Sequence, residues 1–197
     1  VFDLAGTTVN DNRDVHRVLK QALAKNEVEI SLDDANEVMG IPKPVAIRQL
    51  LQRFYDGPME ITDEWINEIH QQFIAEMTRF YKTNSSVSEK TGASDLFKKL
   101  KEKNIKVAID TGFDRLITTP LLERMGWGEL IDCSVTSDEV IRGRPYPDLI
   151  FKAMKLTGIK DPEKVAKVGD TPSDMIEGNA AGCRLVIGIT SGAFSEE

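Results

Sequence analysis

The spacing of apolar residues divides the chain into a purely helical stretch and a mixed stretch. Between residues 11 and 84, apolar side chains recur every three to four residues, which is the spacing of amphipathic helices. Four helices are predicted there: one over 15–24, a short one opened by Ser31, one with Pro44 in its first turn and a long one capped by Thr62. We therefore expect an all-helical unit over 11–84.

The rest of the chain alternates between short apolar strands and amphipathic helices. Strands are predicted to end at Asp3 and over 105–111, 131–136, 165–170 and 184–189, with helices over 94–103, 116–125, 147–156 and 173–181. Such alternation gives a parallel sheet covered on both faces. We predict an α/β fold: a Rossmann-like doubly wound parallel sheet core, made of 1–10 and 85–197, with 11–84 inserted as a helical cap domain.

Composition narrows the classes of partner. The chain has 197 residues, 41% of them hydrophobic, and a formal charge of −7, which argues against a nucleic-acid ligand. No apolar run is long enough for a membrane span, and we expect a cytoplasmic protein. Cys133 and Cys183 are expected to be buried free thiols. Because the chain begins without Met and partway into a strand, we expect that an N-terminal piece precedes it.

Polar residues stand at several predicted strand ends. Asp3 ends the first strand, Thr111 ends the next, and Asp170 and Asp174 follow a later one, with Arg144 in a loop. In an open parallel sheet the carboxyl ends of the strands form the ligand site. The pattern predicts a phosphate and metal site. For single residues other readings stay open: Asp174 as a helix cap, Thr111 as an ordinary strand end and Arg144 in a surface salt bridge.

Together these residues resemble four motifs of the haloacid dehalogenase superfamily, in order and with suitable spacing. The matching segments are Asp3-x-Ala5-Gly-Thr7, Thr111, Arg144-Pro and Gly-Asp170-Thr-Pro-Ser-Asp174. The resemblance implies that Asp3 is a nucleophile that forms an aspartyl-phosphate. It also implies a Mg²⁺ ion held by Asp3, the carbonyl of Ala5, Asp170 and Asp174. Thr111 and Arg144 are expected to bind the phosphoryl group.

The position of Ala5 points to one branch of the superfamily. Most of its phosphatases have there a second Asp that protonates the leaving group, and alanine transfers no proton. Asp-x-Ala-Gly-Thr with Arg144 in place of the usual Lys is similar to the phosphonatase (phosphonoacetaldehyde hydrolase) branch, which forms a Schiff base through a cap lysine. Met39-Gly40-x-x-Lys43 resembles the segment around that lysine, which makes Lys43 the candidate. The substrate is then expected to meet Thr7, Met39, Gly40 and Gly112.

Three positions depart from the phosphonatase pattern. Ala46 stands where the branch has a His, Phe113 where it has a Tyr, and Arg13 near the place of a Cys. A kept scaffold with altered substrate-facing positions suggests a different 2-oxo-phosphonate, with an acidic group that Arg13 could meet.

Two other functions compete with C–P cleavage. The first is hydrolysis of a small phosphate monoester, as by a phosphoglycolate-phosphatase-like enzyme, with Lys43 only binding substrate. The second is a non-catalytic binding or regulatory protein, which retention of Asp3, Arg144 and Asp170 disfavours. We also expect the cap to open and close about linkers near 10–14 and 83–90, and its helices could pair two chains in a homodimer.

Overall fold

The fold is built on a single parallel sheet. A computed structural model describes residues 1–194. Its strands are β1 (Ala108–Thr111), β2 (Cys133–Thr136), β3 (Ala166–Gly169) and β4 (Leu185–Gly188). β1 pairs with β2, and β3 pairs with β4, both in parallel. Phe2 bridges Ile109 on one side and Val168 on the other, also in parallel. The N-terminal segment is therefore the central strand, and the order is β4, β3, Phe2, β1, β2.

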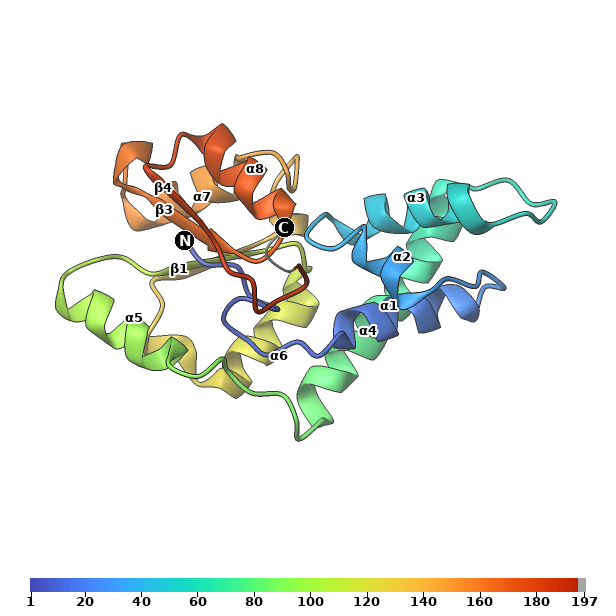
Figure 1. The fold of residues 1–197 in the computed structure, drawn as a ribbon, viewed down its shortest axis with the longest axis horizontal. Helices are drawn as coiled ribbons and strands as arrows, with labels where there is room; N and C mark the ends of the chain where they lie inside the picture. The colour runs from blue at the N-terminus through green and yellow to red at the C-terminus, as the bar shows by residue number, and fades with distance from the viewer. Residues whose placement is uncertain (195–197) are drawn as a thin grey trace.

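Helices cover both faces of this sheet, as predicted. They are α5 (Ala93–Glu102), α6 (Arg115–Met125), α7 (Asp148–Thr157) and α8 (Pro172–Ala181). α7 packs on β1 and β2, and α8 packs on β3 and β4. α5 and α6 lie on the opposite side (Figure 1). This sheet with its helices is called the sheet lobe below, and it confirms the doubly wound α/β prediction.

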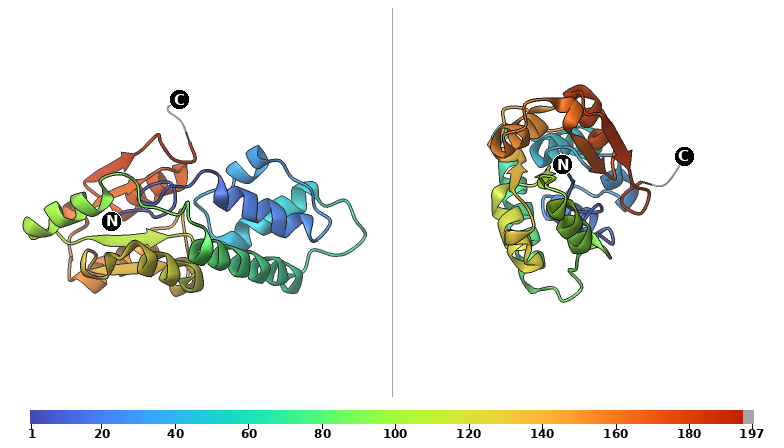
Figure 2. Two further views of the ribbon diagram at one scale, coloured as in Figure 1. Left: turned by 90° about the horizontal axis from the view of Figure 1, so that it is seen from below. Right: turned by 90° about the vertical axis from the view of Figure 1, so that its left-hand side faces the viewer.

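The stretch between the first strand and the sheet helices contains only helices. They are α1 (Asp14–Ala24), α2 (Leu32–Asn36), α3 (Lys43–Phe54) and α4 (Asp63–Thr83), here called the helical lobe. Ser31 caps α2 through a reciprocal capping box with Asp34, and the Thr62 hydroxyl accepts from the backbone N–H of Trp65 at 3.2 Å. Figures 1 and 2 show the helical lobe at one end of an elongated molecule.

The two connections between the lobes lie side by side. Asn10 N donates to Ser88 O at 3.0 Å, Lys90 N donates to Thr8 O at 2.8 Å, and Val9 and Glu89 form an antiparallel bridge. Paired linkers of this kind form a narrow connection, which suits the proposed division into core and cap at these segments.

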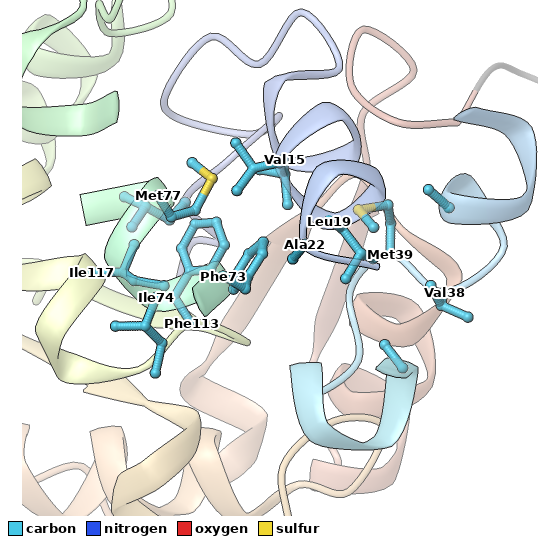
Figure 3. Close-up of a cluster of buried hydrophobic side chains, with 14 of the residues drawn as sticks. Val15, Leu19, Ala22, Val38, Met39, Phe73, Ile74, Met77, Phe113 and Ile117 are labelled. Carbon is cyan, nitrogen blue, oxygen red and sulfur yellow. The ribbon is translucent and has the colours of Figure 1, made fainter. Parts of the chain in front are cut away.

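An apolar cluster joins the two lobes (Figure 3). It includes Val15 of α1 and Phe73 and Met77 of α4, together with Phe113 and Ile117 of the sheet lobe. The Phe73 and Phe113 ring centroids are 6.5 Å apart. The apolar faces of α1 and α4 are thus covered within the chain, and pairing of two chains through the cap stays a prediction.

The two cysteines differ from expectation. Both are free thiols, but each is half-buried rather than buried. Cys133 lies on β2 and Cys183 just before β4, and these are the two edge strands, which have a neighbour on one side only. Among the described residues, no helix is long and apolar enough to cross a membrane.

Candidate active site

The predicted strand-end residues meet at one edge of the sheet. Because all strands are parallel, their carboxyl ends lie together, and the chain order reverses beside the central Phe2 segment. A cavity of about 40 Å³ opens there between the lobes. Nine predicted site residues line it: Asp3, Ala5, Met39, Gly40, Lys43, Thr111, Gly112, Arg144 and Asp170.

Arg144 is the fixed cation of the site. It is 3% exposed, and its Nη1 donates to Asp3 Oδ1 at 2.6 Å. Nη2 donates to the Asp110 carboxylate at 2.6 Å, and Nε donates to Glu177 Oε2 at 2.9 Å. A guanidinium presents several donors in one plane, so it can hold several carboxylates at once. Among the described residues, Arg144 is therefore buried and pairs with buried acids, not with a surface carboxylate.

Three charged residues of this network are absent from the sequence prediction: Asp110, Lys167 and Glu177. Each is completely buried. Lys167 Nζ forms an ion pair with Asp110 and lies 3.1 Å from Glu177 Oε2. A charged residue inside an apolar strand, such as Asp110 after Val-Ala-Ile, is the signal that could have revealed them.

The network shifts the protonation of its acids in opposite directions. Burial alone would raise the pKa of Asp110, but Lys167 and Arg144 outweigh it and lower the pKa to about 2. Burial and the nearby Asp110 raise the pKa of Glu177 to about 7. Asp110 is therefore ionised at neutral pH, whereas Glu177 is partly protonated near pH 7.

Asp3 lies close to other buried carboxylates, which affect its pKa. Burial raises its pKa to about 8, against the effect of Arg144, and Asp174 and Asp170 add to the rise. Around the cavity, the described residues include five buried acids (Asp3, Asp110, Asp170, Asp174 and Glu177) against three buried lysine and arginine side chains (Lys43, Arg144 and Lys167). Such an excess of carboxylate oxygen fits a hard divalent cation, which would offset the repulsion.

Two sets of carboxylates compete as the ligands of such an ion. Carboxylate oxygens of Asp3, Asp110 and Asp174 lie within 4.8 Å of one another. The predicted set has Asp170 in place of Asp110. Asp110 is engaged by Lys167 and Arg144, whereas Asp170 lines the cavity. We favour Asp170 for this reason.

Asp170 and Asp174 are held by different contacts. Asp170 accepts from Thr7 Oγ1 at 3.0 Å and from the backbone N–H of Ala193 at 2.7 Å. Asp174 Oδ2 closes a capping box with Thr171 at the start of α8, while Oδ1 lies 2.9 Å from Arg144 Nη1. Asp174 thus takes part in the helix cap and in the site, although Thr171 is the N-cap residue.

Lys43 lies at the beginning of α3, facing the cavity. It is 3% exposed, and its Nζ lies 5.7 Å from the Phe73 ring centroid and 5.8 Å from that of Phe113. Among the described residues, Nζ has no hydrogen bond or ion pair. Burial lowers the pKa of Lys43 to about 8, with Asp11 and Asp3 opposing the shift. Near neutral pH a lysine with this pKa has a much larger fraction of neutral, nucleophilic amine than an exposed lysine has.

The loop before Lys43 touches the sheet lobe closely. Gly40 has φ +82°, and a Cβ there would lie 2.3 Å from Thr171 Oγ1. A Cβ on Gly112 would lie 3.4 Å from the carbonyl oxygen of Ile41. The Gly112 contact is an ordinary van der Waals distance, whereas at Gly40 only a residue without a side chain lets the loop lie this close to the strand ends, which places Lys43 in the cavity that Asp3 also lines.

Three predicted residues do not line the cavity with the others: Thr7, Arg13 and Asp174, of which Asp174 contacts Arg144 as described above. Thr7 acts through Asp170, as described above. The Arg13 guanidinium lies 2.5 Å from Asp33 Oδ1, and its side chain is 46% exposed. A contact between Arg13 and a substrate group stays a prediction.

Two other residues singled out in the sequence have contacts of a different kind. Ala46 is completely buried in α3. Thr111 Oγ1 accepts a hydrogen bond from the backbone N–H of Phe113 at 3.2 Å.

Comparisons with known proteins point the same way as the geometry. The family model described as haloacid dehalogenase-like hydrolase matches residues 1–187. A phosphonoacetaldehyde hydrolase from Bacillus cereus is 31% identical over 214 residues, covering 100% of this chain and 78% of the relative. Another, from a second Bacillus cereus strain, is 32% identical over 196 residues, covering 92% and 72%.

Solved structures share the fold. A phosphonoacetaldehyde hydrolase-like protein from Oleispira antarctica has a TM-score of 0.84 at 24% identity, covering 97% of this chain and 71% of that one. A predicted phosphoglycolate phosphatase from Haemophilus somnus has a TM-score of 0.80 at 21% identity, covering 97% and 84%. At these identities the likeness concerns the fold alone.

Proposed function

Because the chain belongs to the phosphonatase-like branch of the haloacid dehalogenase-like hydrolases, we propose that it cleaves the C–P bond of a small 2-oxo-phosphonate, such as phosphonoacetaldehyde. The observation that carries the proposal is Lys43. Its buried, unpaired amine with a pKa of about 8 faces the same cavity as Asp3. A lysine that only bound an anionic substrate would gain from a permanent charge, whereas imine formation needs the neutral amine.

The chemistry divides between the two lobes. The neutral amine of Lys43 condenses with the substrate carbonyl and one proton is taken up, giving a protonated imine and water. Asp3 then attacks phosphorus; the C–P bond breaks, and its electron pair moves into the C=C bond of an enamine. Water hydrolyses the aspartyl-phosphate, and the enamine is protonated on carbon and hydrolysed. Neither the imine nor the enamine requires an acid at position 5, which agrees with Ala5.

The remaining residues bind and orient the phosphoryl group. Arg144 holds Asp3 and supplies positive charge, and Thr111 offers a hydroxyl at the neighbouring strand end. We propose Mg²⁺ as the cation, held by Asp3, the Ala5 carbonyl, Asp170 and Asp174. It would neutralise the phosphoryl charge during transfer. The small cavity implies that the cap opens at the paired linkers to admit substrate.

Phosphate monoester hydrolysis is the competing function, and one experiment separates the two. Turnover of phosphonoacetaldehyde and of p-nitrophenyl phosphate is measured with Mg²⁺ for wild type, Lys43→Ala and the control Lys25→Ala, whose lysine is exposed. We expect phosphonate cleavage that Lys43→Ala abolishes and Lys25→Ala retains, with borohydride trapping substrate on Lys43. Turnover of phosphate esters only, with Lys43→Ala changing KM more than kcat, would mean a phosphatase.

A further inference from the structure

Two titratable side chains line the cavity and have no part in the proposed chemistry: Asp11 and His16. His16 belongs to α1 and is 1% exposed. Its Nε2 lies 2.8 Å from Asn36 Oδ1, an acceptor, so Nε2 carries the hydrogen. Among the described residues, Nδ1 is buried without a hydrogen-bond partner. A buried, unpartnered ring nitrogen is costly, so its place beside the cavity calls for an explanation.

Asp11 is fixed so that one oxygen faces His16. Its Oδ1 accepts from the backbone N–H of Asp14 at 2.6 Å and of Val15 at 3.3 Å, at the start of α1. Oδ2 lies 4.0 Å from His16 Nδ1. This distance is too long for a hydrogen bond but short enough to stabilise a positive imidazole. A proton that arrives on Nδ1 therefore finds a counter-charge in place.

The other cavity residues are unsuited to moving a proton to and from Lys43. Ala5 has no ionisable group. Arg144 keeps its proton, Asp3 is the nucleophile and is bound to Arg144, and Asp170 is held by Thr7 and Ala193. This leaves the pair of His16 and Asp11.

We propose that His16, with Asp11 as its counter-charge, is the general base and acid for imine formation at Lys43. The inference rests on the proposed function, because it needs an imine on that lysine. Nδ1 takes one proton from the Lys43 ammonium, and the free amine adds to the carbonyl carbon. One N–H proton of the adduct passes to its alkoxide oxygen. The imidazolium then returns its proton to that hydroxyl, which leaves as water while the nitrogen lone pair forms the protonated C=N bond.

The charges around His16 suit this role. Burial lowers the pKa of His16, and Asn36 and Asp11 raise it, whereas Arg13 and Lys43 lower it further. The imidazole is therefore neutral and ready to accept a proton at neutral pH. The lowered pKa of Lys43 makes its proton easier to remove than that of an exposed lysine.

The test measures imine formation on Lys43 directly. Enzyme is mixed with phosphonoacetaldehyde, or with acetaldehyde as a probe that lacks a C–P bond. Borohydride is added at increasing times, and reduced Lys43 is quantified by peptide mass spectrometry. In His16→Ala we expect trapping and kcat to fall by about 100-fold, the usual contribution of a general base, with little change in KM. Added imidazole should restore the His16→Ala rate in proportion to its concentration.

Two further variants keep the test decisive if His16→Ala folds poorly. His16→Gln fills the same space but accepts no proton, so it should be slow and insensitive to imidazole. Asp11→Asn retains the contacts that start α1 but removes the counter-charge, and trapping should slow by about 10-fold. His70→Ala is the control, because His70 is buried beside Asp114 and does not line this cavity. Imidazole should leave its rate unchanged.

The outcomes separate this inference from the proposed function. Wild-type trapping rates in both His16→Gln and Asp11→Asn would overturn the role of His16 while leaving the Lys43 imine intact. Absence of trapping on Lys43 in the wild type would overturn the proposed function and this inference together. Slow trapping in His16→Ala that imidazole does not restore, together with wild-type trapping in His16→Gln, would also overturn the role of His16.

Discussion

Arg144 Nη1 lies 2.6 Å from Asp3 Oδ1, although the two residues are 141 positions apart in the chain. The same guanidinium contacts Asp110, Asp174 and Glu177. One side chain thus fixes the nucleophile and the acids behind it. Since all of these groups are buried, the contacts concern folding as well as catalysis.

Replacing Arg144 should therefore reduce stability and activity together. In Arg144→Met the surrounding acids keep only Lys167 as a partner, and we expect the free energy of unfolding to fall by about 3–5 kcal/mol, as for other broken buried ion pairs. Urea denaturation at neutral pH measures this. The control is Arg142→Ala, because Arg142 is 57% exposed and pairs with Asp148 at the surface. Its effect should stay within about 0.5 kcal/mol. Equal losses in the two variants would contradict this role of the buried Arg144.

Lys43 should lower the free energy of unfolding by an amount that depends on pH. Its pKa is about 8 in the folded protein against 10.5 in an unfolded chain, so the unfolded state binds more protons between these values. The full loss of stability, about 3 kcal/mol when the pKa difference is converted to free energy, is present below pH 8. It disappears as the pH rises through 10.5. Lys43→Met should therefore be more stable than wild type at pH 7, with a gap that narrows toward pH 10.5.

Urea denaturation of both proteins at several pH values measures this gap. Lys25→Met, in which an exposed lysine is replaced, should show no comparable gain at pH 7. A gap for Lys43→Met that is absent at pH 7, or constant with pH, would mean that the Lys43 ammonium is well solvated in the folded state.

The close approach of Gly40 to Thr171 predicts a difference between two glycine variants. Gly40→Ala places a Cβ 2.3 Å from Thr171 Oγ1 at a φ of +82°. We expect it to cost about 2 kcal/mol or more and to lower kcat, because the loop carrying Lys43 must shift. Gly92 has a similar φ of +89° but open space around its Cβ, so Gly92→Ala should cost only about 1 kcal/mol and leave kcat unchanged. Thermal unfolding and turnover distinguish the two.

The excess of acids around Asp170 predicts how the protein responds to a divalent cation. Because Mg²⁺ would bind the folded state, it should raise the Tm of the wild type, and EDTA should reverse the rise and abolish turnover. Asp170→Asn removes one of the repelling charges and one ligand, so its Tm should no longer respond to Mg²⁺. Asp95→Asn, at a position whose side chain is 75% exposed, should behave as wild type. An unaltered Mg²⁺ response in Asp170→Asn would remove Asp170 from the ligand set.

The secondary structure and the motif residues were largely determined by the sequence. Helix α4 was predicted from its apolar spacing and from Thr62, which is indeed its cap. The strand ends at Asp3, Thr111 and Asp170 were found because a polar residue directly after an apolar run is a local signal. In a parallel sheet such ends meet, so several distant residues could be assigned to one site from local patterns alone.

Other features were decided only by tertiary contacts. From the sequence alone Lys167 is an ordinary strand lysine, and only the folded structure places it beside Asp110 and Glu177. Cys133 is half-buried because β2 is an edge strand. His16 has the spacing of a helix residue, and nothing nearby in the chain shows that it lines the same cavity as Lys43. Burial and pairing depend on residues far away in the sequence. Local periodicity therefore indicates which face a side chain occupies, but not which charges it meets there.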